Sequence, residues 1–235
     1  MNIKEIKRHA LDSLEGNWII AIFGSFIASF LGGIEVSAPS INLDFGGTST
    51  EGGSPEEMEM MAQTLQYLLP FIITVTLVSF GISIALFIIG SAVSVGYAEF
   101  NMMMVEGVKP DIHVIFSSFY QINTAVLARL LVMLRVFLGT LLFIVPGIIA
   151  SLKYAMTHYV IADNPGITAR EALRESERLM DGNKRKFFCL GLSFIGWYLL
   201  VVVTFGIAAI WIVPYEQAAI AEFYNRIKRA KLAET

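Results

Sequence analysis

The sequence predicts an all-α polytopic membrane protein with six transmembrane helices, arranged as three hairpins that each follow a cytoplasmic-side amphipathic helix. Two observations indicate the membrane class. Of the 235 residues, 55% are hydrophobic and 16% are charged, whereas soluble domains contain about 25% charged residues. Residues 16–34, 60–98 and 187–215 also contain no Asp, Glu, Lys or Arg, and about 20 predominantly apolar residues suffice to cross a bilayer as a helix.

The distribution of basic residues predicts the orientation of the chain. Residues 35–66 contain acidic residues but neither Lys nor Arg, whereas basic clusters lie before the first apolar run, within 164–186 and after residue 225. Because basic residues favour the cytoplasmic side of a membrane, we expect both termini and 164–186 in the cytoplasm. Residues 35–66 would then form an acidic extracytoplasmic loop.

This orientation requires an even number of spans between successive basic clusters. We therefore expect spans at about 17–34, 70–100, 122–145, 147–163, 186–204 and 206–225. The uncharged run 60–98 would be about 58 Å long as one helix, so its outer end should project from the bilayer. Val145-Pro146-Gly147 and Thr204-Phe205-Gly206 are the expected outer reversals, because Pro and Gly interrupt helices.

Two stretches of the chain share one layout. Leu14-Glu15-Gly16-Asn17 precedes the first apolar run, and Met180-Asp181-Gly182-Asn183 precedes the fifth expected span. Apolar residues recur at helical spacing before both, at Ile3, Ile6, Ala10 and Leu14, and at Ala169, Ala172, Leu173, Ser176, Leu179 and Met180. The second of these helices should begin with a capping box, formed by Thr168 and Glu171.

A third apolar stripe, at Ile112, Ile115, Phe116 and Phe119, follows Pro110 and precedes the third expected span. Each such stripe predicts a short helix lying at the membrane surface. Within a single membrane domain, 1–235, we therefore expect three repeat-like units at 1–105, 106–163 and 164–230. Similar helix exits support the repeat, since Tyr97-Ala98-Glu99-Phe100-Asn101 resembles the stretch 220–225.

The C-terminal two thirds of the chain also resemble a known family. The stretches "PGIIASLKYAMTHYVIADNPGITAREALRESERLMDGNK", "LSFIGW" and "WIVPYEQAAIAEFYN" are similar to a bacterial membrane-protein family catalogued as domain of unknown function 975. The resemblance covers roughly 90–225 and implies a location in the bacterial cytoplasmic (inner) membrane, without an assigned activity. A weaker resemblance to the membrane domains of some glycerophosphodiester phosphodiesterases implies an assembly or lipid-associated module.

The residues do not form a recognisable catalytic, metal or cofactor motif. The three histidines lie on separate elements, and the sequence contains no HExxH, GxSxG or P-loop pattern. We therefore expect no enzymatic activity, no metal and no cofactor. Lys184, Arg185 and Lys186 lie at the expected inner interface, where each basic residue is attracted to anionic lipid head groups by about 1 kcal/mol. These lipids are the expected partners, and nucleic acid is not.

Charges inside the expected spans are the candidate functional residues. Arg135, Lys153 and Glu216 lie deepest, where an ionised group costs at least about 2.5–3.5 kcal/mol. We expect Glu216 to pair with Arg135 or Lys153, either as a structural ion pair or as part of a polar pathway. A second set is near enough to the inner surface to snorkel: Glu99, Arg129 and Glu222.

These patterns favour a non-catalytic assembly or lipid-associated membrane module. The alternative function is a small transporter or channel that uses the buried charges on spans three, four and six. An intramembrane enzyme would need a nucleophile and a base at motif spacing, which the sequence does not show. A protein partner or a second copy of the chain is compatible with either reading.

Overall fold

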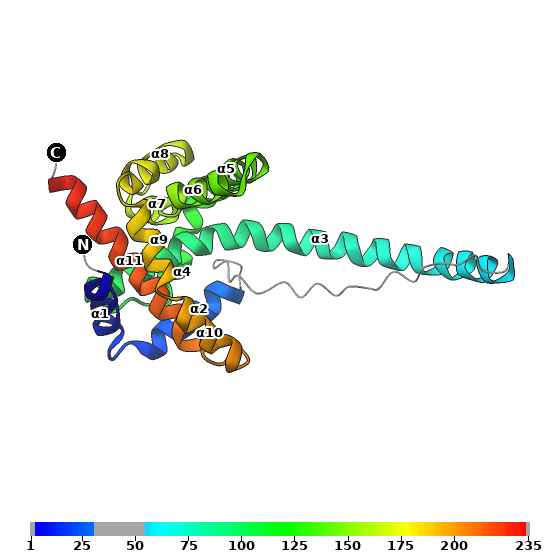
Figure 1. Cartoon of the computed structure of the whole chain (residues 1–235), viewed down its shortest axis with the longest axis horizontal. Helices are drawn as coiled ribbons and strands as arrows, with labels where there is room; N and C mark the ends of the chain where they lie inside the picture. The colour runs from blue at the N-terminus through cyan, green and yellow to red at the C-terminus, as the bar shows by residue number, and fades with distance from the viewer. Residues whose placement is uncertain (1–2, 31–54, 234–235) are drawn as a thin grey trace. The chain divides into compact units, whose positions relative to one another are not determined.

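The computed structural model describes residues 3–30 and 55–233, and these residues form helices and turns without a β-strand (Figure 1). The predicted all-α class is therefore confirmed for this part of the chain. In chain order the helices are α1 (Ile3–Leu14), α2 (Trp18–Phe30), α3 (Pro55–Val105), α4 (Val114–Ser117), the 3-10 helix η1 (Ser118–Gln121), α5 (Ile122–Leu142), α6 (Ile144–Tyr154), α7 (Thr157–Asp163), α8 (Ala169–Met180), α9 (Lys184–Leu192), α10 (Ile195–Val203) and α11 (Ala209–Ala233).

The chain forms two compact units. One comprises Met1–Glu35 and Phe87–Thr235, and the other comprises Val36–Leu86. The expected acidic loop at 35–66 lies outside the described residues as far as position 54, but its last part belongs to α3. Pro55 begins α3 and is followed by Glu56 and Glu57. Proline suits the first helical position.

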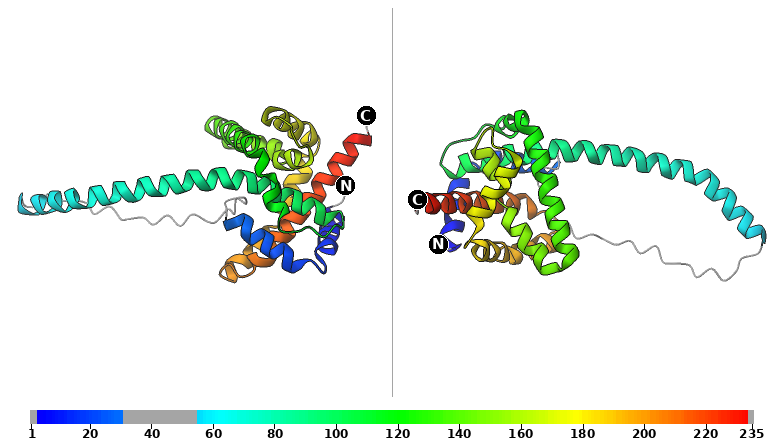
Figure 2. Two further views of the ribbon diagram at one scale, coloured as in Figure 1. Left: turned by 180° about the vertical axis from the view of Figure 1, so that it is seen from behind. Right: turned by 90° about the horizontal axis from the view of Figure 1, so that it is seen from above.

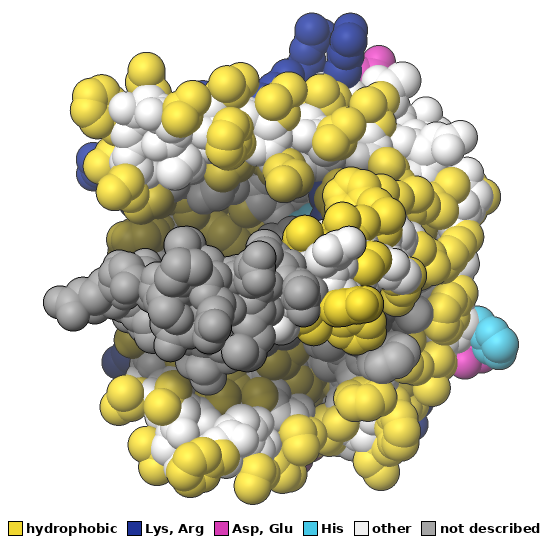
Figure 3. Space-filling model, turned by 90° about the vertical axis from the view of Figure 1, so that its right-hand side faces the viewer, with side chains coloured by type: hydrophobic (Ala, Val, Ile, Leu, Met, Phe, Trp, Pro, Cys, Tyr) yellow, Lys and Arg dark blue, Asp and Glu magenta, His cyan; other side chains and the backbone are white. Residues whose placement is uncertain are grey.

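Four helical stretches in the described residues are long and apolar enough to cross a membrane. They are Gln66–Val105, Val114–Leu142, Ile144–Asp163 and Lys184–Val203. Helix α2 is apolar but shorter, and α11 has basic residues along its C-terminal half. In Figure 3, hydrophobic side chains make up much of the coloured surface turned to the viewer, and most of the charged side chains that show lie near its edge. These observations support a membrane protein, while the count of six spans goes beyond them.

Helices α5 and α6 form a hairpin whose reversal differs from the expected one. The chain turns at Phe143, which is extended (φ −161°, ψ 155°), and Pro146 and Gly147 lie within the first two turns of α6. Proline is tolerated there because the first N–H groups of a helix have no intrahelical partner. A Cβ on Gly147 would lie 2.2 Å from Thr140 Oγ1, so this glycine permits close packing of α6 on α5.

The stretch expected as span five consists of two helices. Helix α9 ends at Leu192 and α10 begins at Ile195. The reversal between α10 and α11 lies at the predicted position, since Phe205 (φ 50°) and Gly206 (φ 91°) both adopt positive φ. Cys189 is exposed on α9.

Two of the three predicted stripes are buried faces of helices. On α1, Ile6, Ala10 and Leu14 are inaccessible to solvent. Helix α8 buries all six residues of its stripe, and the capping box between Thr168 and Glu171 is present. Other helices cover these faces. Helix α1 packs against α11, and α8 packs against α5, α6 and α7. Both stripes therefore face other helices of the larger compact unit, Met1–Glu35 with Phe87–Thr235.

The third stripe does not form the expected helix. Only Val114–Ser117 is α-helical, and the 3-10 helix η1 follows at once. Ile115 is fully buried while Phe116 is 42% exposed. A Cβ on Gly96 of α3 would lie 2.1 Å from the Ile115 carbonyl oxygen. The backbone of this short turn therefore lies directly against α3, which a longer helix with side chains on that face would not allow.

The Gly-Asn stretches after α1 and α8 adopt the same local geometry. Gly16 and Gly182 both have positive φ, at 79° and 75°. The Asn17 side chain donates to the Ser13 carbonyl, and the Asn183 side chain donates to the Leu179 carbonyl. These are equivalent bonds, since each joins an asparagine to the fourth residue before it.

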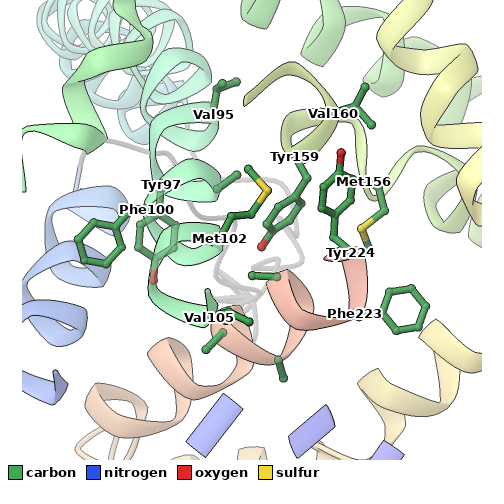
Figure 4. Packing of buried hydrophobic residues seen from close by; sticks show 14 of the residues in the cluster. Val95, Tyr97, Phe100, Met102, Val105, Met156, Tyr159, Val160, Phe223 and Tyr224 are labelled. Atoms are coloured by element: carbon green, nitrogen blue, oxygen red, sulfur yellow. The ribbon is translucent and has the colours of Figure 1, made fainter. Parts of the chain in front are cut away.

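Aromatic residues from α3, α7 and α11 form the centre of the larger unit (Figure 4). The rings of Tyr159 and Tyr224 stack with centroids 5.5 Å apart, and those of Tyr97 and Phe100 stack at 6.1 Å. Each of these four side chains is at most 3% exposed. Helices α1 and α11, which carry the two ends of the chain, lie side by side (Figure 2).

Candidate functional site

Lys153, one of the three deep charges predicted from the sequence, lies at the C-terminal end of α6. Its Nζ is 2.7 Å from Glu177 Oε1 on α8, and its carbonyl oxygen accepts a 2.9 Å hydrogen bond from Ser176. The hydrogen bond from Lys153 holds the pKa of the Glu177 carboxyl below its ordinary value, because it favours the charged form. This pair therefore joins α8 to the α5–α6 hairpin.

Arg135 lies on α5, in the same region of the unit. Its guanidinium carbon is 5.2 Å from the centroid of the Tyr154 ring, within the range of a cation–π contact. Its charge also contributes to the lowered pKa of Glu177. The structure thus brings Arg135 and Lys153 near the carboxylate of Glu177, a residue that the sequence analysis did not single out.

Glu216, the third of the deep charges, lies on α11 and interacts with Tyr198 and Lys7. Its carboxylate accepts a hydrogen bond from the hydroxyl of Tyr198 on α10. The cation that acts on it is Lys7 of α1, whose pKa is lowered because burial penalises the ammonium, an effect that the charge of Glu216 partly offsets. Lys7 also lies 4.0 Å above the centroid of the Phe194 ring.

The predicted pairing of Glu216 with Arg135 or Lys153 is corrected by these contacts. Lys153 is paired with Glu177, and Glu216 is bound by Tyr198. The prediction assumed that depth in the membrane decides the partner. The packing of α8 across α6 and of α1 near the junction of α9 and α10 decides it instead, and these contacts join residues distant in the sequence.

Glu222, predicted to snorkel, is a buried carboxylate between α1 and α11. It is 5% exposed, and its oxygens lie 2.5 Å from Arg226 Nε and 3.3 Å from His9 Nδ1. Arg226 also approaches Glu5 of α1 at 3.5 Å. This network of charges fastens the N-terminal helix to the C-terminal one.

Glu99 and Arg129, which were also predicted to snorkel, contact residues of neighbouring helices. Glu99 accepts a 3.0 Å hydrogen bond from the hydroxyl of Ser117, which joins α3 to α4. The guanidinium of Arg129 lies 4.9 Å from the centroid of the Phe87 ring. Both contacts connect α3 to the segment that follows it.

The interfacial basic residues lie at the start of α9. Lys184 is 3.5 Å from Asp181 Oδ1, Lys186 donates to the Asn183 side chain at 3.2 Å, and Arg185 is exposed. Their contacts are local to the α8–α9 turn, so the structure brings them to one helix end.

A cleft not anticipated from the sequence lies between α8 and the C-terminal half of α11. Its volume is about 520 Å³, and it contains both basic and acidic groups. The lining residues are Asp163, Asn164, Ile167, Glu171, Arg174, Glu175, Arg178, Leu179, Tyr224, Lys228 and Leu232. Asp163 Oδ2 accepts hydrogen bonds from the Tyr224 hydroxyl at 3.0 Å and from Lys228 Nζ at 2.5 Å, so the charge of Asp163 is paired within the cleft. The one sequence signal that could have found this surface is the helical spacing of Glu171, Arg174, Glu175 and Arg178.

Among residues 3–30 and 55–233, no group of three or more His, Cys, Asp and Glu side chains is placed to hold a metal ion. The carboxylates of Glu177, Glu216 and Glu222 each contact a cation, a tyrosine or both. Such an arrangement can orient helices or hold a polar ligand through charge.

Comparison with known proteins gives one family. The model of a family described as "Protein of unknown function (DUF975)" matches residues 58–231, well over half of the chain. The chain belongs to the DUF975 family. No curated protein and no solved structure matches it. The DUF975 region contains every charged site described above except the α1 residues that contact it, Glu5, Lys7 and His9.

Proposed function

We propose that this DUF975 protein is a non-catalytic integral module of the bacterial inner membrane that organises lipid or an assembly partner. In this proposal α2 and the N-terminal half of α11 also cross the bilayer, which gives six spans with both termini in the cytoplasm. The basic residues support this orientation, because Lys4, Lys184 and Lys231 lie on segments that the positive-inside rule places together.

The closed aromatic centre of the larger unit is the observation that carries the proposal. Tyr97, Tyr159 and Tyr224 are at most 3% exposed and come from α3, α7 and α11. A transport pathway between these helices would need a water-filled passage at their centre, whereas closely packed rings leave no space for one. A fixed scaffold is the function that such packing serves best.

The contacts between helices support a ring of three interlocked units. In each unit a short leading segment precedes a helical hairpin, and α1, α4 and α8 are these segments. Helix α1 contacts α11, α4 lies against α3, and α8 contacts α6 and α7. Each leading segment thus contacts the returning helix of another unit, which would bind the units into one scaffold.

A specific observation favours the alternative function, a small transporter or channel. Glu216 is only partly buried and is bound by the exposed Tyr198, and Pro214 lies two residues before it inside α11. Proline removes a backbone hydrogen bond in a helix, and broken helices form ion sites in transporters.

Flux measurements separate the two functions. The full chain would be reconstituted in vesicles of phosphatidylethanolamine and phosphatidylglycerol, beside protein-free vesicles and vesicles containing the Glu216→Gln variant. A scaffold gives proton and ion flux equal to that of protein-free vesicles for both proteins. If the wild type carries flux and the Glu216→Gln variant does not, the protein is a transporter or channel and the scaffold function is wrong.

Lipid retention provides the positive arm of the same test. A lipid-organising module purified in mild detergent should retain phospholipid, detectable by native mass spectrometry. Replacing Lys184, Arg185 and Lys186 together by Gln should reduce the anionic fraction of that lipid, since each basic residue contributes about 1 kcal/mol of attraction. Unchanged lipid composition would contradict the role of these residues.

A further inference from the structure

The cleft between α8 and the C-terminal half of α11 contains cations from both helices. Arg174 and Arg178 lie four residues apart on α8, which places them on one face of that helix, and Lys228 lines the same cleft from α11. No carboxylate among the described residues forms an ion pair with Arg174. Its charge acts on Glu171, whose pKa is lowered mainly by hydrogen bonds from Thr168 and further by this arginine.

The carboxylates of the cleft are already bound by protein groups, whereas the cations have donors left. Each of the three carboxylates accepts two hydrogen bonds, and they belong to Asp163, Glu171 and Glu175. Arg178 bonds Glu175 through Nε and one Nη, and Lys228 bonds Asp163. Guanidinium and ammonium groups have further N–H donors and no acceptor. The three cations can therefore donate to an anionic ligand.

Two of these cations are held in place without a ligand. The bonds from Arg178 to Glu175 are 2.9 and 2.7 Å long, and Lys228 is held by Asp163 at 2.5 Å. Asp163 is fixed in turn by the Tyr224 hydroxyl, and the Tyr224 ring stacks on Tyr159 in the core. Groups that are positioned before binding lose less conformational freedom when the ligand arrives.

The size and lining of the cleft indicate more than a bare anion. Its volume of about 520 Å³ lies within the range of small-molecule sites, about 300–1,000 Å³. A water molecule in the liquid occupies about 30 Å³, so an ion of a few atoms would fill only a small part. Ile167, Leu179 and Leu232 also line the cleft and can contact the carbon atoms of a larger ligand.

We propose that this cleft binds a phosphate ester, with its phosphate group at Arg174, Arg178 and Lys228 and its carbon part along Leu179 and Leu232. A guanidinium can bind two phosphate oxygens at once, and phosphate has oxygens left for the other cations, whereas a carboxylate has only two. Phospholipid head groups and soluble phosphate esters share this chemistry. Where the ester is a lipid, the proposal deepens the lipid-organising function and rests on it.

Isothermal titration calorimetry of the full chain tests the site, in an uncharged detergent and a phosphate-free buffer. The probes are glycerol 3-phosphate, inorganic phosphate and dihexanoyl phosphatidylglycerol. An ester should bind the wild type, and Arg174→Gln should weaken this binding about tenfold or more, because hydrogen bonds between charged groups are lost. Arg174→Lys keeps the charge without the planar group and should retain part of the affinity.

Arg170→Gln is the matched control, because it removes the same charge from an exposed position of α8 that does not line the cleft. Its affinity for the ester should equal that of the wild type. Thermal melting of each variant should match the wild type, which shows that the variants are folded. Inorganic phosphate should bind more weakly than the ester, since it cannot contact the apolar residues of the cleft.

The source of the phosphate follows from which ester binds. Binding of dihexanoyl phosphatidylglycerol without glycerol 3-phosphate identifies a lipid head group, and tight binding of glycerol 3-phosphate identifies a soluble ester. The proposal is overturned if neither ester binds, or if inorganic phosphate binds as tightly as the esters. Equal affinities of Arg174→Gln and Arg170→Gln also overturn it. So does an acidic peptide that binds the wild type and is not displaced by the esters, because the site would then serve a protein.

Failure of this site and failure of the proposed function give different results. If the cleft binds no ester, the vesicle flux and the lipid held by Lys184, Arg185 and Lys186 are unaffected, because these residues lie outside the cleft. If the protein is instead a transporter, the wild type carries flux that Glu216→Gln abolishes, and the calorimetry of Arg174→Gln is unchanged by that result.

Discussion

The ammonium of Lys7 on α1 donates a 3.0 Å hydrogen bond to the carbonyl oxygen of Ser193, at the junction between α9 and α10. The last carbonyls of a helix have no intrahelical partner, and a lysine can satisfy one of them. The same ammonium lies 4.0 Å above the Phe194 ring. A residue of the first helix thus stabilises a helix break more than 180 residues later.

Lys7→Met should destabilise the protein by about 1 kcal/mol, because hydrogen bonds to charged groups contribute about 1.5–3 kcal/mol and burial of the ammonium offsets part of this. The expected fall in melting temperature is about 2–4 °C. Arg8→Met, on the exposed face of the same helix, is the control and should melt like the wild type. Equal melting of both variants would show that the Ser193 contact carries no stability.

The ion pair of Lys153 and Glu177 predicts a dependence of stability on pH. The pKa of Glu177 is lowered in the folded protein, mainly by its hydrogen bond from Lys153. A carboxyl with a lowered folded pKa stabilises the fold above its unfolded pKa, and this contribution is lost as the pH falls through the folded value. The wild type should therefore have a higher melting temperature than the Glu177→Gln variant at pH 7. The difference between the two melting temperatures should shrink below about pH 4.

Glu175→Gln is the control for this pH series, because Glu175 is half-buried like Glu177 but pairs with Arg178 of its own helix instead of joining α8 to another helix. Its melting temperature should stay near that of the wild type, since surface pairs contribute about 0–1 kcal/mol. If the gap between wild type and Glu177→Gln were constant from pH 7 to pH 3, the bond to Lys153 would not be the source of the stability.

The buried carboxylate of Glu222 should be sensitive to substitution. Glu222→Gln weakens the contacts of this side chain to Arg226 and His9. The free energy of unfolding should fall by about 1–3 kcal/mol as a result. The double variant with His9→Gln should lose less than the two single losses added together, because the groups interact directly. Thermal melting in detergent measures both, with Asp12→Asn on the exposed face of α1 as the control. Additive losses would argue against a direct contact.

Packing of the α5–α6 hairpin can be tested at one glycine. Gly147→Ala places a Cβ 2.2 Å from Thr140 Oγ1 and 2.9 Å from Thr140 Cα, so the helices must separate. The expected loss is about 1–3 kcal/mol, as for overpacking elsewhere. Gly191→Ala on α9 meets no atom within 4 Å and should be neutral or stabilising by up to about 1 kcal/mol. A neutral Gly147→Ala would mean that this close approach does not occur.

Orientation in the membrane can be tested in a Cys189→Ser background, which removes the one cysteine of the sequence. We expect Gln66→Cys to react with an impermeant maleimide added outside intact cells. Leu232→Cys, which replaces an exposed residue near the C-terminus, should react only after the cells are opened. Labelling of Leu232→Cys in intact cells would contradict the even number of spans and the cytoplasmic C-terminus.

The sequence by itself determined the features that depend on local chemistry. The absence of charge over long runs gives the apolar helices, and Thr168 with Glu171 gives the capped start of α8. Helical spacing of Ile6, Ala10 and Leu14 identifies the buried face of α1. Each of these results follows from residues within a few turns of one helix, where hydrogen bonding and side-chain periodicity do not depend on the rest of the chain.

Only the tertiary structure decided which charges meet. Glu177 bonds Lys153, and Lys7 caps the break at Ser193, because α8 crosses α6 and α1 lies beside the α9–α10 junction. The reversal at Phe143 and the short α4 likewise depend on Gly147 and Gly96, where backbones approach closely. Such contacts are fixed by how helices pack against each other. Composition and spacing along one helix contain no information on the distance between two helices.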